Sequence, residues 1–430
     1  PGNDLFQSET VAVGEYAFHL ANPDFATSGF SIDQDLAVTS DTQLFFLSQL
    51  RAATSDQIAQ VRLSLDGGSS WPTTVYSQPG IGFPGEGSFS LRETSLAEYA
   101  GQDVRLRFQL DFSGGSAFTG ADTRSGWLIV DIQIGSEYQK QQFSIGDPSP
   151  VEQEYLEYIN RARADALAEA NRLRTEPTAS IQNAYNFFDV NPDDIVSQYQ
   201  YYVDQDCIAQ HAQPLSFNEQ LLLVSDLHTQ DMFENQTQSH TSSSNPPAPL
   251  QARDTFGQRL DRVGYVGVAG ENIFSYSEST ANGHAGFAVD WGNSQNPSGA
   301  CYSPAFAGQG MQNPAGHRIN IHDGSFKEAG IGVIEGSNGS VGPQVVTQNF
   351  GNPGNVSYIT GVVYEDANGN QFYEVGEGRG GIRVDVEGSP YFAVSTDSGA
   401  YSIPVSEDGD YLVTFQGEGI EGSQQVVEIR

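Results

Sequence analysis

The stretch that decides how this chain is divided runs from Gly146 to Arg174 and reads GDPSPVEQEYLEYINRARADALAEANRLR. Its first five residues contain two prolines and small polar side chains, a composition that ends strands and is typical of linkers. A helical period begins directly afterwards, and Ser149 can cap its start. The apolar residues that recur at steps of three and four are Val151, Tyr155, Tyr158, Ile159, Ala162, Ala166 and Ala170. We therefore predict one helix over 151–174 and a change of domain near residue 146.

The residues before this boundary have the pattern of a β domain. Short apolar runs at 43–47, 59–65 and 104–110 are separated by Gly, Ser, Asp and Asn. Apolar and polar residues alternate through the last run, as they do in a strand that is buried on one face only. These features predict a β-sandwich.

Three segments narrow this prediction. Residues 64–71, SLDGGSSW, fit a hairpin in which Asp66 caps the turn amides and a glycine takes a positive φ. Together with residues 98–108 and 125–131, this hairpin resembles the jelly-roll domains, akin to MAM and carbohydrate-binding modules, of secreted bacterial proteins. The resemblance implies a jelly roll over residues 1–145. Such a domain has either a face that binds a glycan or a partner, or only a spacing role.

The far end of the chain returns to short strands. Apolar runs at 359–364, 382–386, 400–405 and 411–415 are again separated by glycine-rich and acidic segments. This spacing predicts a small β-sandwich over residues 354–430.

A loop within this tail, residues 366–377 (DANGNQFYEVGE), has the spacing of an EF-hand calcium loop. The predicted calcium ligands are the side chains of Asp366, Asn368, Asn370, Glu374 and Glu377 and the carbonyl of Phe372. Gln371 stands where EF-hands usually have glycine, so the sharp turn must be made differently. The loop and its flanking strands resemble the calcium-binding B-repeat domains of bacterial surface adhesins, which implies a stiff, non-catalytic rod. The alternative is an acidic hairpin that binds no ion.

The charge of the chain excludes some partners. Against 54 Asp and Glu stand 19 Lys and Arg, for a net charge of −35. A field of this sign repels nucleic acid and anionic lipid, so we expect no nucleic-acid partner, and it suits a saline or calcium-containing medium.

No run approaches the ~18 apolar residues of a transmembrane helix. A chain that begins at Pro1, without Met or a signal peptide, has the form of a processed product.

Chemistry that depends on histidine belongs to the middle of the chain. Six of the seven histidines lie between residues 211 and 322. They are interspersed with Trp291 and with short motifs at 214–218, 238–242, 270–273, 316–321 and 326–333. In this order the motifs resemble the bacterial branch of the CAP superfamily (cysteine-rich secretory, antigen 5 and pathogenesis-related proteins). The resemblance implies an α-β-α sandwich over residues 146–353, and so a multidomain chain with a β domain on either side of it.

The resemblance also implies a central cleft lined by two histidines and acidic residues. Position by position, these are His240, Glu271 and His317. Eukaryotic members have a second glutamate three residues after the tryptophan, where this chain has Ser294. Two imidazoles and a carboxylate can hold zinc or another divalent metal, can transfer a proton, or can be purely structural. All three interpretations stay open.

The other histidines of this region have plainer interpretations. His228 lies in the middle of a predicted helix beside leucines, and we interpret it as a core histidine. His284 and His322 are interpreted as loop residues.

Two insertions separate this region from a minimal CAP domain, at residues 175–213 and 293–315. Each contains one of the two cysteines, Cys207 and Cys301. In an oxidising compartment, a disulfide between them would staple the insertions together near the cleft. Two buried thiols are the alternative. Long ordered insertions often form lids or subunit contacts.

Together these features predict a non-enzymatic protein, secreted or on a bacterial cell surface, that works in extracellular binding or assembly. Its partners would be other extracellular proteins or copies of itself in a filament or matrix, because sheet edges on both outer domains can pair with neighbouring chains. One alternative is a metal-dependent hydrolase with His240 and His317 as zinc ligands and Glu271 as base, although the chain has neither an H-E-x-x-H nor a G-x-S-x-G motif. Another is a lipid or sterol carrier, which rests on the family resemblance alone.

Overall fold

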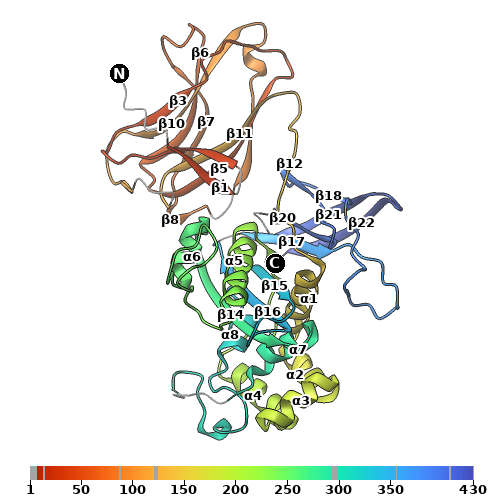
Figure 1. Ribbon diagram of the computed structural model, residues 1–430. Coiled ribbons are helices and arrows are strands. Elements are labelled where there is room, and N and C mark those ends of the chain that lie inside the picture. The colour runs from red at the N-terminus through yellow and green to blue at the C-terminus, as the bar shows by residue number, and fades with distance from the viewer. Residues whose placement is uncertain are drawn as a thin grey trace.

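The computed structural model describes residues 7–12, 15–86, 89–120, 124–292, 298–354, 356–405 and 408–429. Figure 1 shows a β domain at the N-terminal end, a mixed helical and β region in the middle, and a second β region beside it. The chain is therefore multidomain, as predicted.

The N-terminal domain consists of two antiparallel sheets. One sheet has the order β1 (Gln7–Ala12), β2 (Glu15–Leu20), β11 (Trp127–Gly135), β5 (Gln43–Ala53) and β8 (Gly82–Gly85), and β9 (Ser90–Ser95) also pairs with β5. The other has the order β3 (Ser28–Ser31), β10 (Asp103–Phe112), β6 (Gln57–Ser64) and β7 (Thr73–Pro79), and β4 (Leu36–Ala37) pairs with β10. The alternation predicted for residues 104–110 is confirmed, because the apolar residues of β10 are buried and the polar ones are partly exposed. The narrower assignment to a jelly roll with a glycan-binding face stays a prediction.

The hairpin between β6 and β7 is built as its sequence indicates. The Asp66 carboxylate accepts a hydrogen bond from the Ser70 N–H at 2.9 Å. Gly67 and Gly68 both have positive φ, which only glycine adopts without strain.

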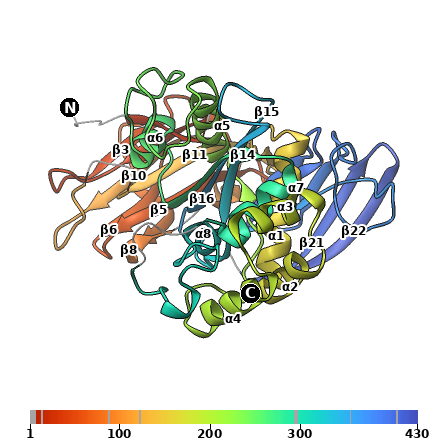
Figure 2. The same ribbon diagram turned by 60° about the horizontal axis from the view of Figure 1, so that its bottom comes forward.

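The middle domain has helices on both faces of a four-stranded sheet. The sheet order is β13 (Ser216–Phe217), β15 (Glu328–Glu335), β16 (Gln344–Asn352) and β14 (Val268–Ser277). Helix α5 (Glu219–Glu234) packs on one face, and α1 (Pro150–Ala164), α7 (Thr280–Ala285) and α8 (Gly316–His322) lie toward the other (Figure 2). The remaining helices are α2 (Ala166–Thr175), α3 (Ala179–Phe188), α4 (Pro192–Asp204) and α6 (Phe256–Val263). This is the layered α-β-α arrangement expected for this region.

Glycine lets α5 approach the sheet closely. A Cβ atom on Gly330 would lie 2.0 Å from the Leu221 carbonyl carbon, and one on Gly332 would lie 2.5 Å from that of Ser225. Any side chain at these positions would push α5 away from β15. The motif at 326–333 is therefore a packing motif as well as a strand.

The single helix predicted over 151–174 is wrong, because the structure divides it at Asp165. This residue has extended dihedral angles and ends α1, and its carboxylate accepts from the N–H groups of Leu167 and Ala168 at 3.0 Å to begin α2. A short acidic side chain that bonds to nearby amides competes with helix continuation. The predicted cap at Ser149 is confirmed, within a capping box completed by Glu152.

The C-terminal region forms two small sheets. One has the order β12 (Gln141–Gln142), β19 (Tyr391–Val394), β18 (Arg383–Val386), β21 (Gly409–Gly417) and β22 (Ile420–Ile429), and the other pairs β17 (Ser357–Val362) with β20 (Ala400–Val405). Strand β12 precedes the middle domain in the sequence but pairs with the C-terminal sheet. The segment before the linker is therefore hydrogen-bonded to the C-terminal region.

A buried polar contact ties the C-terminal region to the middle domain. Glu328 on β15 is 3% exposed. Its carboxylate accepts from the hydroxyls of Tyr358 at 2.5 Å and Tyr265 at 3.0 Å, and from the side-chain amide of Asn218 at 3.1 Å. Because Tyr358 belongs to β17, this contact crosses between the two regions.

No helix within the described residues has the length and apolar character needed to cross a membrane.

Candidate functional site

The three predicted cleft residues come from three elements of the middle domain. His240 lies in the loop after α5, Glu271 on β14 and His317 in the first turn of α8. The side chain of His240 is 58% exposed and that of His317 is 23% exposed, whereas that of Glu271 is 2% exposed. Both imidazoles can therefore be reached from solvent, and the carboxylate lies beneath the surface.

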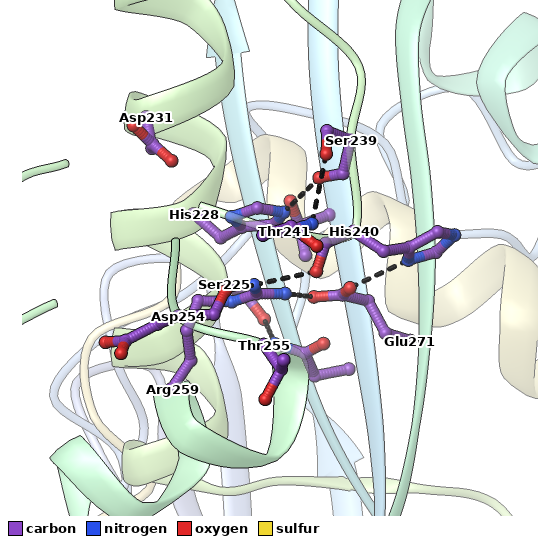
Figure 3. A network of polar contacts seen from close by, with 12 residues as sticks. Ser225, His228, Asp231, Ser239, His240, Thr241, Asp254, Thr255, Arg259 and Glu271 are labelled. Atoms are coloured by element: carbon purple, nitrogen blue, oxygen red, sulfur yellow. Dashed lines mark hydrogen bonds and ion pairs between the residues drawn. The ribbon is translucent and has the colours of Figure 1, made fainter. Parts of the chain in front are cut away.

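Glu271 is held from two sides (Figure 3). The His240 Nδ1 atom lies 2.8 Å from Glu271 Oε1, and the Arg259 guanidinium donates to Oε2 at 2.5 Å. Burial alone would raise the pKa of Glu271, but the hydrogen bond from His240 and the charge and hydrogen bond of Arg259 outweigh it, so the pKa is lowered. The carboxylate is ionised and both of its oxygens are engaged.

Arg259 also positions the loop that carries His240. Its guanidinium, which is fully buried, donates to the carbonyl of His240 at 2.9 Å and to that of Asp254 at 3.2 Å. Helix α6 therefore fixes the backbone of the loop and the carboxylate partner of its imidazole together. In Figure 3 the second ring nitrogen of His240 faces away from Glu271.

His228 also contacts the loop that carries His240. It is fully buried on α5, as predicted for a core histidine, and its Nε2 atom lies 2.9 Å from the Ser239 carbonyl. Burial lowers its pKa to about 4, so the ring is neutral. Its Nδ1 atom has no hydrogen-bond partner among the described residues.

His317 has a carboxylate partner that the sequence analysis missed. The Asp290 side chain is 2% exposed, with one oxygen 2.8 Å from His317 Nδ1 and the other accepting from the His317 backbone N–H at 3.0 Å. Burial alone would lower the pKa of His317, but the charge of Asp290 and the hydrogen bond to it outweigh burial and raise the pKa. The site thus contains two imidazole–carboxylate pairs.

The turn that presents Asp290 is held by another buried arginine. Residues Gly286–Asp290 form a π-helical turn, and Asp290 has a φ of 56°, which is uncommon for a residue other than glycine. The Arg318 guanidinium donates to the carbonyls of Ala288 and Val289 at 2.7 Å. The sequence feature that could have indicated this carboxylate partner is the aspartate directly before Trp291. Ser294, the position expected for the second acid, lies outside the described residues.

Amide side chains connect the two pairs. The Asn272 amide donates to the His317 carbonyl at 3.1 Å, and the Asn320 amide donates to Asn272 Oδ1 at 2.9 Å and to the Glu271 carbonyl at 3.3 Å. Since Asn272 follows Glu271 on β14 and Asn320 lies one turn after His317 on α8, the two pairs belong to adjoining elements.

The donor set limits how a metal can be held here. Within the described ranges, no group of three or more His, Cys, Asp or Glu side chains is placed to hold a metal ion. Both carboxylates are bound to imidazole Nδ1 atoms, as carboxylates are when they orient a metal-binding histidine from behind. The Nε2 atom of each ring is therefore the nitrogen that would be left to bind a metal such as zinc.

The predicted calcium loop has an internal framework of hydrogen bonds. The Asp366 carboxylate accepts from the backbone N–H groups of Gly369, Asn370 and Gln371 at 2.8–3.0 Å. Gln371 makes the sharp turn with a φ of 60°, so it adopts the conformation usually given to glycine. The last ligand, Glu377, accepts from the N–H groups of residues 367 and 374 at 3.0 Å.

The remaining predicted ligands of this loop lie close together. The Asn368 amide donates to Glu374 at 2.7 Å and the Asn370 amide donates to it at 3.2 Å. Rotation of an asparagine amide exchanges its nitrogen for its oxygen, so both groups can turn an oxygen toward a cation. The predicted ligands thus share one loop, although its three acidic side chains, like others in the described residues, are not placed together as a metal-holding group.

The interpretation of His284 and His322 as loop residues is wrong. His284 lies in α7 and is 1% exposed, with its Nε2 atom 3.0 Å from Glu169. His322 ends α8 and is fully buried, and burial lowers its pKa to about 3. Both helices are short and begin after irregular segments, so their periodicity is too brief to show in the sequence.

Cys207 and Cys301 form a disulfide, as predicted. The bond joins the end of the first insertion, which contains α3 and α4, to the second insertion.

Comparison with known proteins identifies the middle domain. Residues 156–350 match the model of the family described as CAP, the cysteine-rich secretory protein family. No curated protein matches. Among solved structures, 11 chains match. One is the glycoside hydrolase domain of Endo-D from Streptococcus pneumoniae R6, at 14% identity and a TM-score of 0.19 over 30% of this chain and 18% of that chain. This likeness is too weak to bear on fold or function.

Proposed function

Because residues 156–350 belong to the CAP superfamily, we propose that this chain is a non-enzymatic extracellular protein whose middle domain binds a ligand through the Nε2 atoms of His240 and His317. One observation carries the proposal. The carboxylates beside the imidazoles have both oxygens engaged, Glu271 by His240 and Arg259, and Asp290 by the ring and the backbone N–H of His317. Such carboxylates are poor general bases, whereas imidazoles oriented through Nδ1 leave Nε2 for a ligand.

Two features support an extracellular location. Disulfides persist in oxidising compartments, and the Cys207–Cys301 bond joins the two insertions. The family model that matches the chain is that of a secretory protein family.

A titration with Zn²⁺ tests the binding site. Zn²⁺ is the probe because it accepts neutral imidazole nitrogen and needs no third histidine when water completes its shell. We expect the whole chain to bind Zn²⁺ in isothermal titration calorimetry, and expect His240→Ala and His317→Ala each to weaken binding at least about tenfold. His211→Ala is the matched control, because His211 is exposed and lies outside the site. Equal binding by all four proteins would overturn the proposal.

A metal-dependent hydrolase is the second candidate, and the same two imidazoles favour it. Zinc bound there would supply a Lewis acid, while Glu271 and Asp290 orient the rings. The candidates separate when the zinc-loaded chain is incubated with peptidoglycan, casein and a p-nitrophenyl ester. Hydrolysis that is lost in His317→Ala would make this chain an enzyme. A lipid or sterol carrier has only the family to support it.

We also propose that residues 366–377 bind calcium. Support comes from the EF-hand spacing, the turn at Gln371 and the proximity of Glu374 to Asn368 and Asn370. Calcium titration should show one site that is lost in Glu377→Gln and kept in Glu418→Gln, a control at the exposed end of the neighbouring hairpin. Calcium binding that survives Glu377→Gln would place the ion elsewhere.

We further propose that copies of this chain assemble into a filament or matrix. Among the described strands, β22 lies at the edge of its sheet and pairs with β21 alone, and β1 lies at the edge of the N-terminal sheet. Edges of this kind accept a strand from another chain. Electron microscopy with calcium and with chelator tests the idea, since ordered polymers would support it and monomers at every concentration would contradict it.

A further inference from the structure

A second groove, whose lining contains none of the residues of the two histidine pairs, lies between α3 and the end of β14. Its volume is about 480 Å³, which is within the range of small-molecule sites. Five aromatic side chains and one carboxylate dominate its lining, namely Phe187, Phe188, Phe274, Tyr276, Trp291 and Glu278. One side of it, α3, lies in the first predicted insertion, and the other side belongs to β14, α7 and Trp291.

Helix α3 packs on the domain core and also lines the groove. Ile181 and Tyr185 are buried in the core. The residues at 180, 183, 184, 187 and 188, again at helical spacing, line the groove, and Ala184 and Phe188 among them also pack against the core. Phe187 is 82% exposed and adjoins the other aromatic rings of the groove, and apolar side chains that gather in a groove mark ligand-binding surfaces. An exposed ring of this size over a groove indicates a ligand.

The rings that line the groove are inclined to one another and do not form a flat platform. Phe187 is inclined at 89° to Phe188, and Phe274 at 75° to Tyr276. Trp291 is 9% exposed and stacks against Phe188, so its face is not available to a sugar ring. Aromatic faces that approach one volume from several directions suit a compact cation.

The charge of the groove favours the same class of ligand. Glu278 is the one charged residue among those that line it, and its side chain is exposed. The Asn282 side chain accepts from the Glu278 N–H at 3.1 Å, so this amide oxygen is engaged by the backbone. With a net charge of −35 on the whole chain, an anionic head such as a fatty-acid carboxylate would be repelled.

We propose that this groove binds a small organic cation of the quaternary-ammonium class, with its charge against Glu278 and the faces of Phe187 and Tyr276. The lining of this site contains neither His240 nor His317, so the proposal does not depend on metal binding by those residues.

A pair of isosteric probes tests the charge requirement. The whole chain is titrated calorimetrically with choline and with 3,3-dimethylbutan-1-ol, which has the same shape but carbon in place of the charged nitrogen. We expect saturable binding of choline and at least about tenfold weaker binding of the alcohol. Laurate is the third probe and should not bind.

Variants then locate the site. Glu278→Gln should weaken choline binding about fivefold, and Phe187→Ala should weaken it about tenfold or more. Phe83→Ala is the matched control, because Phe83 is 77% exposed but lies in the N-terminal domain. Since both altered residues are exposed, each variant should melt at the temperature of the parent protein. Equal affinity for the two isosteres, preferential binding of laurate, no saturable binding of choline, or full binding by Phe187→Ala would each overturn the proposal.

Discussion

Asp290 acts on one atom of one side chain, the Nδ1 atom of His317. By placing a negative charge 2.8 Å away, it raises the pKa of an imidazole that burial would otherwise lower. The charged imidazole is therefore favoured more in the folded protein than in the unfolded chain. The resulting stabilisation is complete below the unfolded pKa of histidine and is lost as the pH rises through the folded pKa.

Asp290→Asn should remove this effect. We expect the pKa of His317 to fall below the ordinary histidine value, because burial then acts alone. The measurement is an NMR titration of the His317 ring protons in both proteins, with His211 as the internal reference. An unchanged pKa would mean that the two side chains do not interact in solution.

Gln371 has a backbone conformation that is uncommon for its residue type. Its φ of 60° costs a non-glycine residue about 1 kcal/mol. We expect Gln371→Gly to raise the free energy of unfolding by ~0.5–1 kcal/mol in urea. Gln371→Ala is the control, since alanine keeps the strain. Equal effects of glycine and alanine would contradict this account of the turn.

At the scale of elements, Asp165 separates two helices that the periodicity alone would join. Its carboxylate satisfies two amides at the start of α2. Asp165→Ala should therefore lower the free energy of unfolding by about 1 kcal/mol, as the loss of an N-cap does. Asp147→Ala, an exposed linker change, should have little effect. Chemical denaturation measures the free energy of unfolding of both variants. An equal decrease in the two would mean that net charge, and not capping, is responsible.

Local patterns predicted the elements better than they predicted the site. Alternation in β10 and the period of α1 and α5 are visible because apolar burial repeats at a fixed spacing. Asp290 and Arg259 were missed for two reasons. An irregular π-helical turn presents Asp290, and Arg259 forms a buried ion pair with a residue on another element, and neither feature leaves a repeating pattern in the sequence. The same limit explains His284 and His322, whose burial depends on short helices packed by the rest of the domain.

At the scale of the molecule, the buried contact between Glu328 and Tyr358 joins the C-terminal region to the middle domain. Burial raises the pKa of Glu328, against the hydrogen bonds from Tyr358, Tyr265 and Asn218. Because the folded carboxyl holds its proton more tightly than the unfolded one, this group lowers stability as the pH rises from the ordinary carboxyl range through the folded pKa.

Tyr358→Phe should weaken this junction. We expect a loss of ~1.5–3 kcal/mol, since a hydrogen bond to a buried charged group is removed, and a steeper fall of stability with rising pH. Tyr276→Phe, at an exposed position, is the control. Calorimetric melts between pH 5 and about 8 provide the test. A variant as stable as the parent protein at every pH would show that the two regions unfold separately.

The central claim is that both cleft imidazoles donate through Nδ1 to a carboxylate and leave Nε2 for a ligand. Long-range ¹H–¹⁵N NMR of the histidine rings, recorded above the pKa of His317, distinguishes the two neutral tautomers directly. The account predicts that His240 and His317 both carry their proton on Nδ1 and that Zn²⁺ shifts the Nε2 resonances. A proton on Nε2 of either ring, with no response to Zn²⁺, would contradict it.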